Sequence, residues 1–431
     1  MNPSSPKPPT ARAGLRNYLL VTGAYWADTV TDGAMRMLVL FYFYNLGYTP
    51  LAVASLFIFY EVFGILTNLF GGYIGARFGL KSTLFIGLGM QLVALSMLAF
   101  APPSALVVAY VMVSQALSGI AKDMTKMSSK SAVKLIVPEE ASATLYRWVA
   151  VLTGSKNALK GVGFFLGGLL LTLLDFQSAL RWLVALVGTT LLLTALLMRG
   201  GLGQANKKAK FGQMFSRNGA VNKLAAARIF LFGARDVWFV VGLPVFLSSA
   251  LGWSFWQSGG FLAVWVIGYG IVQAATPGLL RSRVQEQHEP DGRTATILAF
   301  VLAGLPAAIA LALDAGIAPA RVVVVGLILF GVVFALNSAV HSYLILAYTD
   351  SDKVAMNVGF YYMANAAGRL AGTVLSGALY QWGLQSGAQQ GLIACLWASA
   401  IFVLIAGLLS LLLPRHTAAR SKPIELGDLG D

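Results

Sequence analysis

The sequence predicts an all-α membrane protein with twelve transmembrane helices arranged as two six-helix bundles. Three observations lead to this prediction. The chain has 431 residues, is 57% hydrophobic and only 11% charged, and has a mean hydropathy of +0.73, which is not the composition of a soluble domain. Twelve stretches are apolar over the roughly 20 residues that a membrane-spanning helix needs. Short segments of the first half also resemble segments of the second half at a nearly constant offset.

Each span is predicted from its run of apolar residues, and most connections between the runs are short. Spans 3, 6, 9 and 12 carry no charge at membrane depth, so we expect them to face lipid. Spans 1, 2, 4, 5, 7 and 11 carry charges among apolar neighbours, so we expect them to line the centre of the protein. In chain order the twelve spans cover residues 17–45, 51–76, 82–101, 105–135, 144–173, 179–199, 222–249, 255–280, 294–313, 320–347, 354–381 and 389–413.

A Gly-, Lys- and Asn-rich segment after the sixth span divides the chain. Loop lysines and arginines number twenty on the side that holds both termini and two on the opposite side. The positive-inside rule therefore predicts a multi-pass protein with both termini in the cytoplasm. The predicted parts are an N-terminal six-helix bundle (1–199), a cytoplasmic linker (200–221), a C-terminal six-helix bundle (222–413) and a cytoplasmic tail (414–431).

Three pairs of segments indicate an internal repeat. "NLGYTP" and "ALGWSF" lie 205 positions apart, "KSAVK" and "NSAVH" 207, and "KGVGFFLGG" and "RLAGTVLSG" 209. The last pair aligns Gly163 with Gly372 and Gly168 with Gly377. Offsets near half the chain length predict two parallel halves related by an axis along the membrane normal.

Nine basic and five acidic residues lie at the predicted membrane depth. A lysine or arginine at the centre of a span costs roughly 2.5–3.5 kcal/mol, so these residues must face protein or water. Their excess of positive charge suits a small anionic substrate. The candidate substrate-binding residues, with two polar residues of span 10, are Arg36, Lys122, Lys126, Lys160, Arg228, Arg235, Arg369, Asn337 and His341.

Four lysines of span 4 recur every four residues, from Lys122 through Lys126 and Lys130 to Lys134. Residues four apart drift by about 40° per step on a helix, so the four side chains cannot all point to one place. Lys122 and Lys126 lie deeper and are the binding candidates. The alternative interpretation is a cytoplasmic helix extension whose lysines extend to the membrane surface.

The buried carboxylates have two interpretations. Asp28, Asp32, Glu61 and Asp123 are candidates for proton coupling or gating. They could equally neutralise neighbouring cations, and an i,i+4 ion pair between Asp32 and Arg36 is one example. Residue types alone do not separate a proton site from a salt-bridge partner.

Other classes of function fit the composition less well. The single cysteine, Cys395, excludes a disulfide framework within the chain, and three scattered histidines give no zinc motif, so we expect no metal and no cofactor. The net charge of +14 comes largely from lysines and arginines in the predicted loops, as in other membrane proteins, so no nucleic-acid partner is expected. A membrane enzyme would need a His/Asp/Glu constellation, and His341 has no carboxylate at a recognisable spacing. A non-transporting sensor would need a larger soluble segment. We therefore predict a carrier and no enzyme.

The loop after span 2 resembles the signature motif of major facilitator superfamily transporters. In "GGYIGARFGLKS" the matching positions are Gly72, Gly75, Arg77, Gly79 and Lys81. Ala76 stands where that family usually has an aspartate, which departs from the pattern. "VPEE" at 137–140 also fits the loop between spans 4 and 5 of the family. The resemblance implies the twelve-helix major facilitator fold and secondary active transport.

A narrower resemblance rests on "TDGAMRMLVLFYFYNLGYTP", "SGIAKDMTKMSSKSAVKL" and "LTGSKNALKGVGFFLGG". These segments resemble the bacterial organoarsenical efflux permease family (ArsJ type). The resemblance implies export of 1-arseno-3-phosphoglycerate across the bacterial cytoplasmic (inner) membrane, arsenate resistance, and glyceraldehyde-3-phosphate dehydrogenase as the partner that makes the substrate. No binding residue of that family is carried over.

The chemistry of the residues agrees with an arsenate ester. Trivalent arsenic binds thiols, whereas a pentavalent arsenate ester that also bears a phosphate is a polyanion that arginines and lysines bind. A carrier for another phosphorylated or carboxylated metabolite remains the alternative. Proton antiport is the first mode of coupling to test.

Overall fold

The structure is a computed structural model that describes residues 11–132, 142–198, 218–281, 290–349 and 354–414. Throughout that part the regular structure is helical, which confirms the all-α prediction for these residues. Most of the predicted linker and all but the first residue of the predicted tail lie outside the described residues. The helices are α1 (Ala11–Asn45), α2 (Pro50–Ser55), α3 (Ile58–Phe78), α4 (Leu80–Phe100), the 3₁₀ turn η1 (Pro103–Ala105), α5 (Val108–Ala132), α6 (Ser142–Leu173), α7 (Phe176–Leu197), α8 (Gly219–Phe239), α9 (Gly242–Ser249), α10 (Phe255–Arg281), α11 (Gly292–Asp314), α12 (Pro319–Ala347), α13 (Val354–Leu384) and α14 (Ala388–Ser410).

The predicted spans coincide with these helices, although two spans are each divided into a short and a long helix. Span 2 consists of α2 and α3, and span 7 consists of α8 and α9. Local chemistry explains where α2 begins, because the Thr49 side chain accepts from the Ala52 N–H and Pro50 occupies the first helical position. The φ of Gly47 is +85° and that of Gly252 is +67°, so the glycines of the first repeat pair share a left-handed turn.

Eight of the predicted spans have the length and composition of a membrane-crossing helix within the described residues. The other four predicted spans correspond to α1, α5, α6 and α13, which have 25 to 35 residues and are therefore long enough to cross a bilayer. These four helices carry Asp32, Lys122, Lys160 and Arg369, so polar residues lower their apolar character. The fold is a multi-pass helical membrane protein, and the count of twelve spans stays a prediction.

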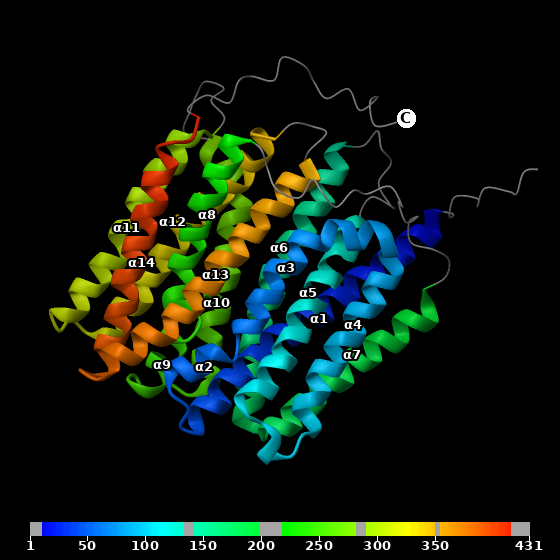
Figure 1. Ribbon diagram of the computed structural model, residues 1–431, viewed down its shortest axis with the longest axis horizontal. Coiled ribbons are helices and arrows are strands. Elements are labelled where there is room, and N and C mark those ends of the chain that lie inside the picture. The colour runs from blue at the N-terminus through cyan, green and yellow to red at the C-terminus, as the bar shows by residue number, and fades with distance from the viewer. Residues whose placement is uncertain (1–10, 133–141, 199–217, 282–289, 350–353, 415–431) are drawn as a thin grey trace, which may run out of the picture.

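The helices run along one another, and α6 and α13 make the principal contacts between the first and second parts of the chain (Figure 1). α6 packs against α10, and α13 packs against α2 and α3. Short turns at 46–49, 174–175, 250–254 and 385–387 gather at one end of the molecule, which we call the short-turn end.

The repeat glycines explain how closely these helices pack. A Cβ on Gly168 would collide with the Phe255 carbonyl at the start of α10, and a Cβ on Gly377 would collide with the Pro50 carbonyl at the start of α2. Gly163 packs against α1 at Gly33, and its counterpart Gly372 packs against α8, the helix that corresponds to α1 in the second repeat. Aligned positions thus make equivalent contacts, as two parallel repeats require.

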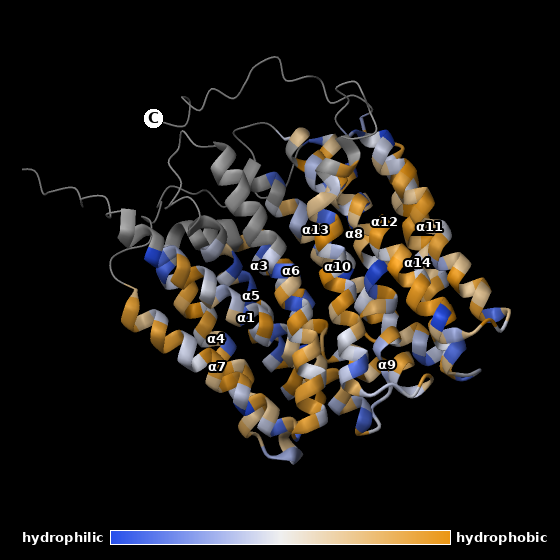
Figure 2. Cartoon of the chain, turned by 180° about the vertical axis from the view of Figure 1, so that it is seen from behind, coloured by the Kyte–Doolittle hydropathy of each residue, from blue (hydrophilic) through white to orange (hydrophobic). Residues whose placement is uncertain are grey.

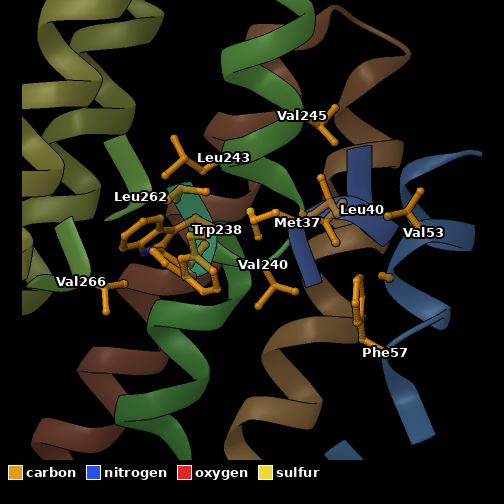
Figure 3. Packing of buried hydrophobic residues seen from close by; sticks show 14 of the residues in the cluster. Met37, Leu40, Val53, Phe57, Trp238, Val240, Leu243, Val245, Leu262 and Val266 are labelled. Carbon is orange, nitrogen blue, oxygen red and sulfur yellow. The ribbon is translucent and has the colours of Figure 1, made fainter. Parts of the chain in front are cut away.

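An apolar core joins the two parts of the chain near the short-turn end. Met37 of α1, Val53 of α2, Trp238 of α8 and Leu262 of α10 belong to one buried cluster (Figure 3). Outside this core, α4, α7, α11 and α14 present apolar surfaces, and the exposed leucines of α7 are an example (Figure 2). Several buried charges lie among the residues of this core, because Arg36 stands between Met35 and Met37, and Asp236 stands between Ala234 and Val237.

Candidate functional site

The carboxylate of Glu61, in the first turn of α3, is fully buried and accepts from two arginines. Arg36 of α1 donates through both terminal nitrogens to Oε1 at 3.4 Å, and Arg369 of α13 donates to Oε2. The Arg369 Nε also lies 3.8 Å from Oδ2 of Asp236 on α8, whose Oδ1 accepts from the Arg235 Nε at 2.6 Å. These five residues, which we call the ion network, connect four helices and contain three cations and two carboxylates.

Tyr60 connects two further charges to this region. Its hydroxyl donates to Asp32 Oδ1 at 2.8 Å and accepts from the Lys122 Nζ at 2.8 Å. The Lys122 ammonium also lies 4.0 Å from the centroid of the Tyr60 ring, and the Arg36 guanidinium lies 5.2 Å from it. An aromatic ring attracts both cations through its negative face. Lys122 therefore has a phenol partner and lies near, but outside, the ion network.

Asp123 has a complete set of partners. Oδ1 accepts from the Lys126 ammonium at 2.5 Å, and Oδ2 accepts from Thr67 at 2.7 Å and from Asn68 at 3.1 Å. The Asn68 carbonyl oxygen accepts from Lys126 at 2.8 Å. This closed arrangement holds α3 against α5 and satisfies the buried carboxylate.

Asp28 differs from the other carboxylates. Its side chain is fully buried, and Oδ2 accepts from the Thr125 hydroxyl at 2.6 Å. Oδ1 has no hydrogen-bond partner in the described part of the chain, and no lysine or arginine there lies within 4.0 Å of the carboxylate. A buried carboxylate oxygen without a hydrogen-bond donor is costly. Among the candidate carboxylates, Asp28 is the one with an oxygen left without a partner in the described part of the chain.

Lys160 of α6 has no carboxylate partner. Its ammonium lies 5.5 Å from the centroid of the Phe164 ring, and the described residues supply it with no ion pair. A cation at membrane depth without a bonded anion is one that an anionic ligand would stabilise.

A separate polar cluster lies between α8 and α12. Arg228 donates to the Ser338 carbonyl at 3.3 Å, and its guanidinium stacks 3.8 Å from the centroid of the Phe232 ring. Asn337 and His341 are one turn apart on α12, and both are at least 99% buried. We call Arg228, Asn337 and His341 the α8–α12 cluster. It shares no hydrogen bond or ion pair with the ion network among the described residues, although Arg235 of that network lies 5.1 Å from the centroid of the same Phe232 ring, and it contains a cation but no carboxylate.

The structure thus divides the predicted site residues into groups. Arg36, Arg235 and Arg369 belong to the ion network, and Lys126 belongs to the Asp123 arrangement. Lys122 binds the Tyr60 hydroxyl, and Lys160 lies against the Phe164 ring. The predicted Asp32–Arg36 ion pair is wrong, because Tyr60 binds Asp32 and Glu61 binds Arg36. The Lys130 side chain and Lys134 lie outside the described residues.

Several residues that contribute to these groups were absent from the predicted site, and Tyr60, Thr125 and Asp236 are examples. Tyr60 had no signal, because a tyrosine in an apolar run is ordinary. Thr125 is one residue among many small polar ones. Asp236 could have been included, because it is an acid at the predicted membrane depth.

The fold and these buried charges define a membrane transporter. The sequence profile of the Major Facilitator Superfamily matches residues 20–337, more than half of the chain, and the chain belongs to that superfamily. No curated protein matches the sequence.

Two crystal structures have similar folds. The nucleoside transporter NupG, in a mutant form, has a TM-score of 0.69 at 14% identity and covers 93% of this chain and 99% of its own. A POT family transporter in complex with a thioalcohol-conjugated peptide has a TM-score of 0.73 at 11% identity, with 92% and 95% covered. At such identities the likeness concerns the fold alone.

Proposed function

We propose that this transporter exports an organic phosphate or arsenate anion, and that its substrate is 1-arseno-3-phosphoglycerate. The observation that carries the proposal is the excess of cations over carboxylates among the residues at the predicted membrane depth. Lys160 and Arg228 have no carboxylate partner among the described residues, and Lys122 binds a phenol. Uncompensated cations are costly at membrane depth unless a ligand neutralises them.

The substrate follows from the sequence resemblance together with this chemistry. An ester that carries both arsenate and phosphate presents several oxyanion oxygens, which lysine and arginine bind. The one cysteine, Cys395, is fully buried in the apolar core, a poor position for a ligand of trivalent arsenic. Glyceraldehyde-3-phosphate dehydrogenase would supply the ester from arsenate and a triose phosphate, with NAD⁺ as the acceptor of the aldehyde's hydride. The ester would then hydrolyse outside the cell, and the cell would gain arsenate resistance.

Transport would proceed between two six-helix bundles around a central aqueous cavity. We place the short-turn end outside the cell and both termini in the cytoplasm, in the inner membrane of a bacterium. Export would be coupled to proton entry. Of the four candidate carboxylates, Asp28 would carry the proton, because both carboxylate oxygens of Asp32, Glu61 and Asp123 have hydrogen-bond donors whereas Oδ1 of Asp28 has none among the described residues.

Everted membrane vesicles test the substrate. Vesicles that contain the protein should accumulate labelled arsenate only when the dehydrogenase, its triose phosphate and NAD⁺ are supplied together. Vesicles without the protein are the control for leakage. Uptake of arsenate without the enzyme would contradict the ester, and uptake of arsenite would contradict the oxyanion chemistry. If another phosphorylated or carboxylated metabolite is taken up instead, the broader anion carrier stands without the arsenical substrate.

A further inference from the structure

The α8–α12 cluster holds several polar atoms without partners at complete or nearly complete burial. Within the described residues, the Arg228 Nε, both amide atoms of Asn337 and the His341 Nδ1 make no hydrogen bond. The exposed fractions are 4% for Arg228, 0% for Asn337 and 1% for His341. A buried polar group without a partner costs about 1–3 kcal/mol, and few such groups occur in folded proteins. Three neighbouring residues with this property indicate a ligand site.

The position of Arg228 is fixed from several sides. Its Nη1 donates to the Ser338 carbonyl, and its guanidinium lies 3.8 Å from the Phe232 centroid and 4.8 Å from the Tyr361 centroid. Ser338 in turn accepts from the Tyr269 hydroxyl at 3.2 Å. These contacts leave the Nε edge of the guanidinium unpartnered, so a planar donor is held in place for an oxyanion.

The α12 side of the cluster offers different chemistry. Asn337 has an unpartnered acceptor as well as an unpartnered donor, and an oxyanion cannot donate to the acceptor. A hydroxyl group can donate to Asn337 Oδ1 and accept from Nδ2 or from a histidine N–H. His341 lies four residues on, on the same face of α12, and Arg228 acts on it electrostatically.

We propose that the α8–α12 cluster binds a hydroxyl-bearing organic oxyanion, with the oxyanion at Arg228 and the adjacent hydroxyl at Asn337 and His341. This site differs in chemistry from the ion network, where each arginine already holds a carboxylate. The inference rests on the proposed anion export and adds that the carrier recognises a hydroxyl beside the charge.

Binding to the purified full-length protein in detergent tests the inference without transport. The probes are 3-phosphoglycerate, inorganic phosphate, and 3-(phosphonooxy)propionate, the analogue of 3-phosphoglycerate that lacks the hydroxyl and is called 3-phosphopropionate below. Isothermal titration calorimetry measures their affinities. The wild-type protein should bind 3-phosphoglycerate about tenfold tighter than 3-phosphopropionate, since an unpaired buried polar group in the site costs about that factor. Equal affinities for the two, or no binding of either, would overturn the proposal.

Variants locate the preference. Asn337→Ala should abolish the preference for the hydroxylated probe while binding 3-phosphopropionate within about twofold of wild type. Arg228→Gln should weaken both probes by about tenfold or more. If size-exclusion chromatography shows that Arg228→Gln does not fold, Arg228→Lys replaces it as the test variant, because lysine keeps the charge and loses the planar fork. Ser399→Ala removes another fully buried hydroxyl without a partner, on α14, and should change nothing. A tenfold preference that survives in Asn337→Ala would place the hydroxyl elsewhere and contradict the assignment.

The outcomes separate this inference from the arsenical substrate. If vesicles fail to take up the arsenate ester but the hydroxyl preference depends on Asn337, the substrate assignment is wrong and the site stands. If the ester is transported and the preference is absent, the site is wrong and the substrate assignment stands.

Discussion

Glu61 on α3 and Arg369 on α13 form an ion pair although they lie 308 positions apart in the chain. Glu61 also accepts from Arg36, so one carboxylate serves two cations. This pair connects helices that the sequence repeat assigns to different halves. A carrier that opens toward alternate sides of the membrane would have to change the contact between such helices.

The first prediction concerns the stability of this connection. Glu61→Gln leaves the buried Arg36 guanidinium without its carboxylate and leaves Arg369 with only the 3.8 Å contact to Asp236, and the loss of one partner of a buried pair costs about 3–5 kcal/mol. We expect a lower apparent Tm in detergent, measured by tryptophan fluorescence. The double variant Glu61→Gln/Arg369→Gln removes one of the stranded charges and should recover part of the loss. A double variant as unstable as the sum of its single variants would show that the two residues are not coupled.

The second prediction concerns the repeat glycines. Gly168→Ala and Gly377→Ala each place a Cβ against a backbone carbonyl, where no side chain can move to make room. Overpacking of this kind costs typically about 1–3 kcal/mol, so both variants should unfold at lower temperature than wild type. Gly89→Ala on α4 is the matched control, because nothing lies within 4 Å of its Cβ and alanine favours a helix. Equal effects at all three positions would mean that close packing at α2 and α10 does not matter.

The helices could be predicted from the sequence because hydropathy is a local property. Runs such as 389–413 need no partner to be recognised, and α14 lies there. Charges could be assigned to membrane depth for the same reason. Their partners could not, because Arg36 has Asp32 four residues away on its own helix but binds Glu61 on another. The partner of Arg36 is determined by packing between helices that are distant in sequence.

The α8–α12 cluster shows the same limit. Asn337 and His341 were predicted from their polarity, and Arg228 from its charge. Which of these residues lie together depends on how α8 is rotated about its axis where it packs against its neighbours. No local sequence pattern indicates that rotation. Tyr60 was missed because its role arises only where α1, α3 and α5 meet, at the Asp32 carboxylate and the Lys122 ammonium.

The third prediction concerns Asp175, which caps α7 outside the membrane-spanning segment. Hydrogen bonds from the side chain and backbone of Ser178 hold the pKa of Asp175 below its usual value. The folded-state pKa is depressed, so this stabilisation is present above the unfolded pKa of about 3.9 and is lost as the pH falls through the lower folded value. Asp175→Ala should cost about 1 kcal/mol at pH 7.

Asp175→Asn is the matched control for this effect, because asparagine also caps helices but does not titrate. Relative to Asp175→Asn, the wild-type protein should lose stability as the pH falls below about 4. Parallel stability curves for the two proteins from pH 7 to pH 3 would exclude a contribution from this carboxylate.

The fourth prediction concerns proton coupling through Asp28. The residue is fully buried, receives one hydrogen bond from Thr125 and has no cation within ion-pair distance in the described part of the chain. Asp28→Asn keeps an acceptor for Thr125 and should therefore fold with a Tm close to that of wild type. In everted vesicles it should lose uphill accumulation driven by a pH gradient while it retains downhill exchange of labelled for unlabelled substrate.

Asp123→Asn is the contrasting variant. Asp123 holds the Lys126 ammonium at 2.5 Å, so its neutralisation strands a buried cation and should lower the Tm. The wild-type protein should lose concentrative transport when an uncoupler collapses the pH gradient, and Asp28→Asn should not respond to the uncoupler. If Asp28→Asn accumulates substrate uphill and responds to the uncoupler as wild type does, the proton is carried elsewhere. If the wild-type protein itself does not respond, the carrier is a facilitator, and hydrolysis of the ester outside the cell provides the direction of export.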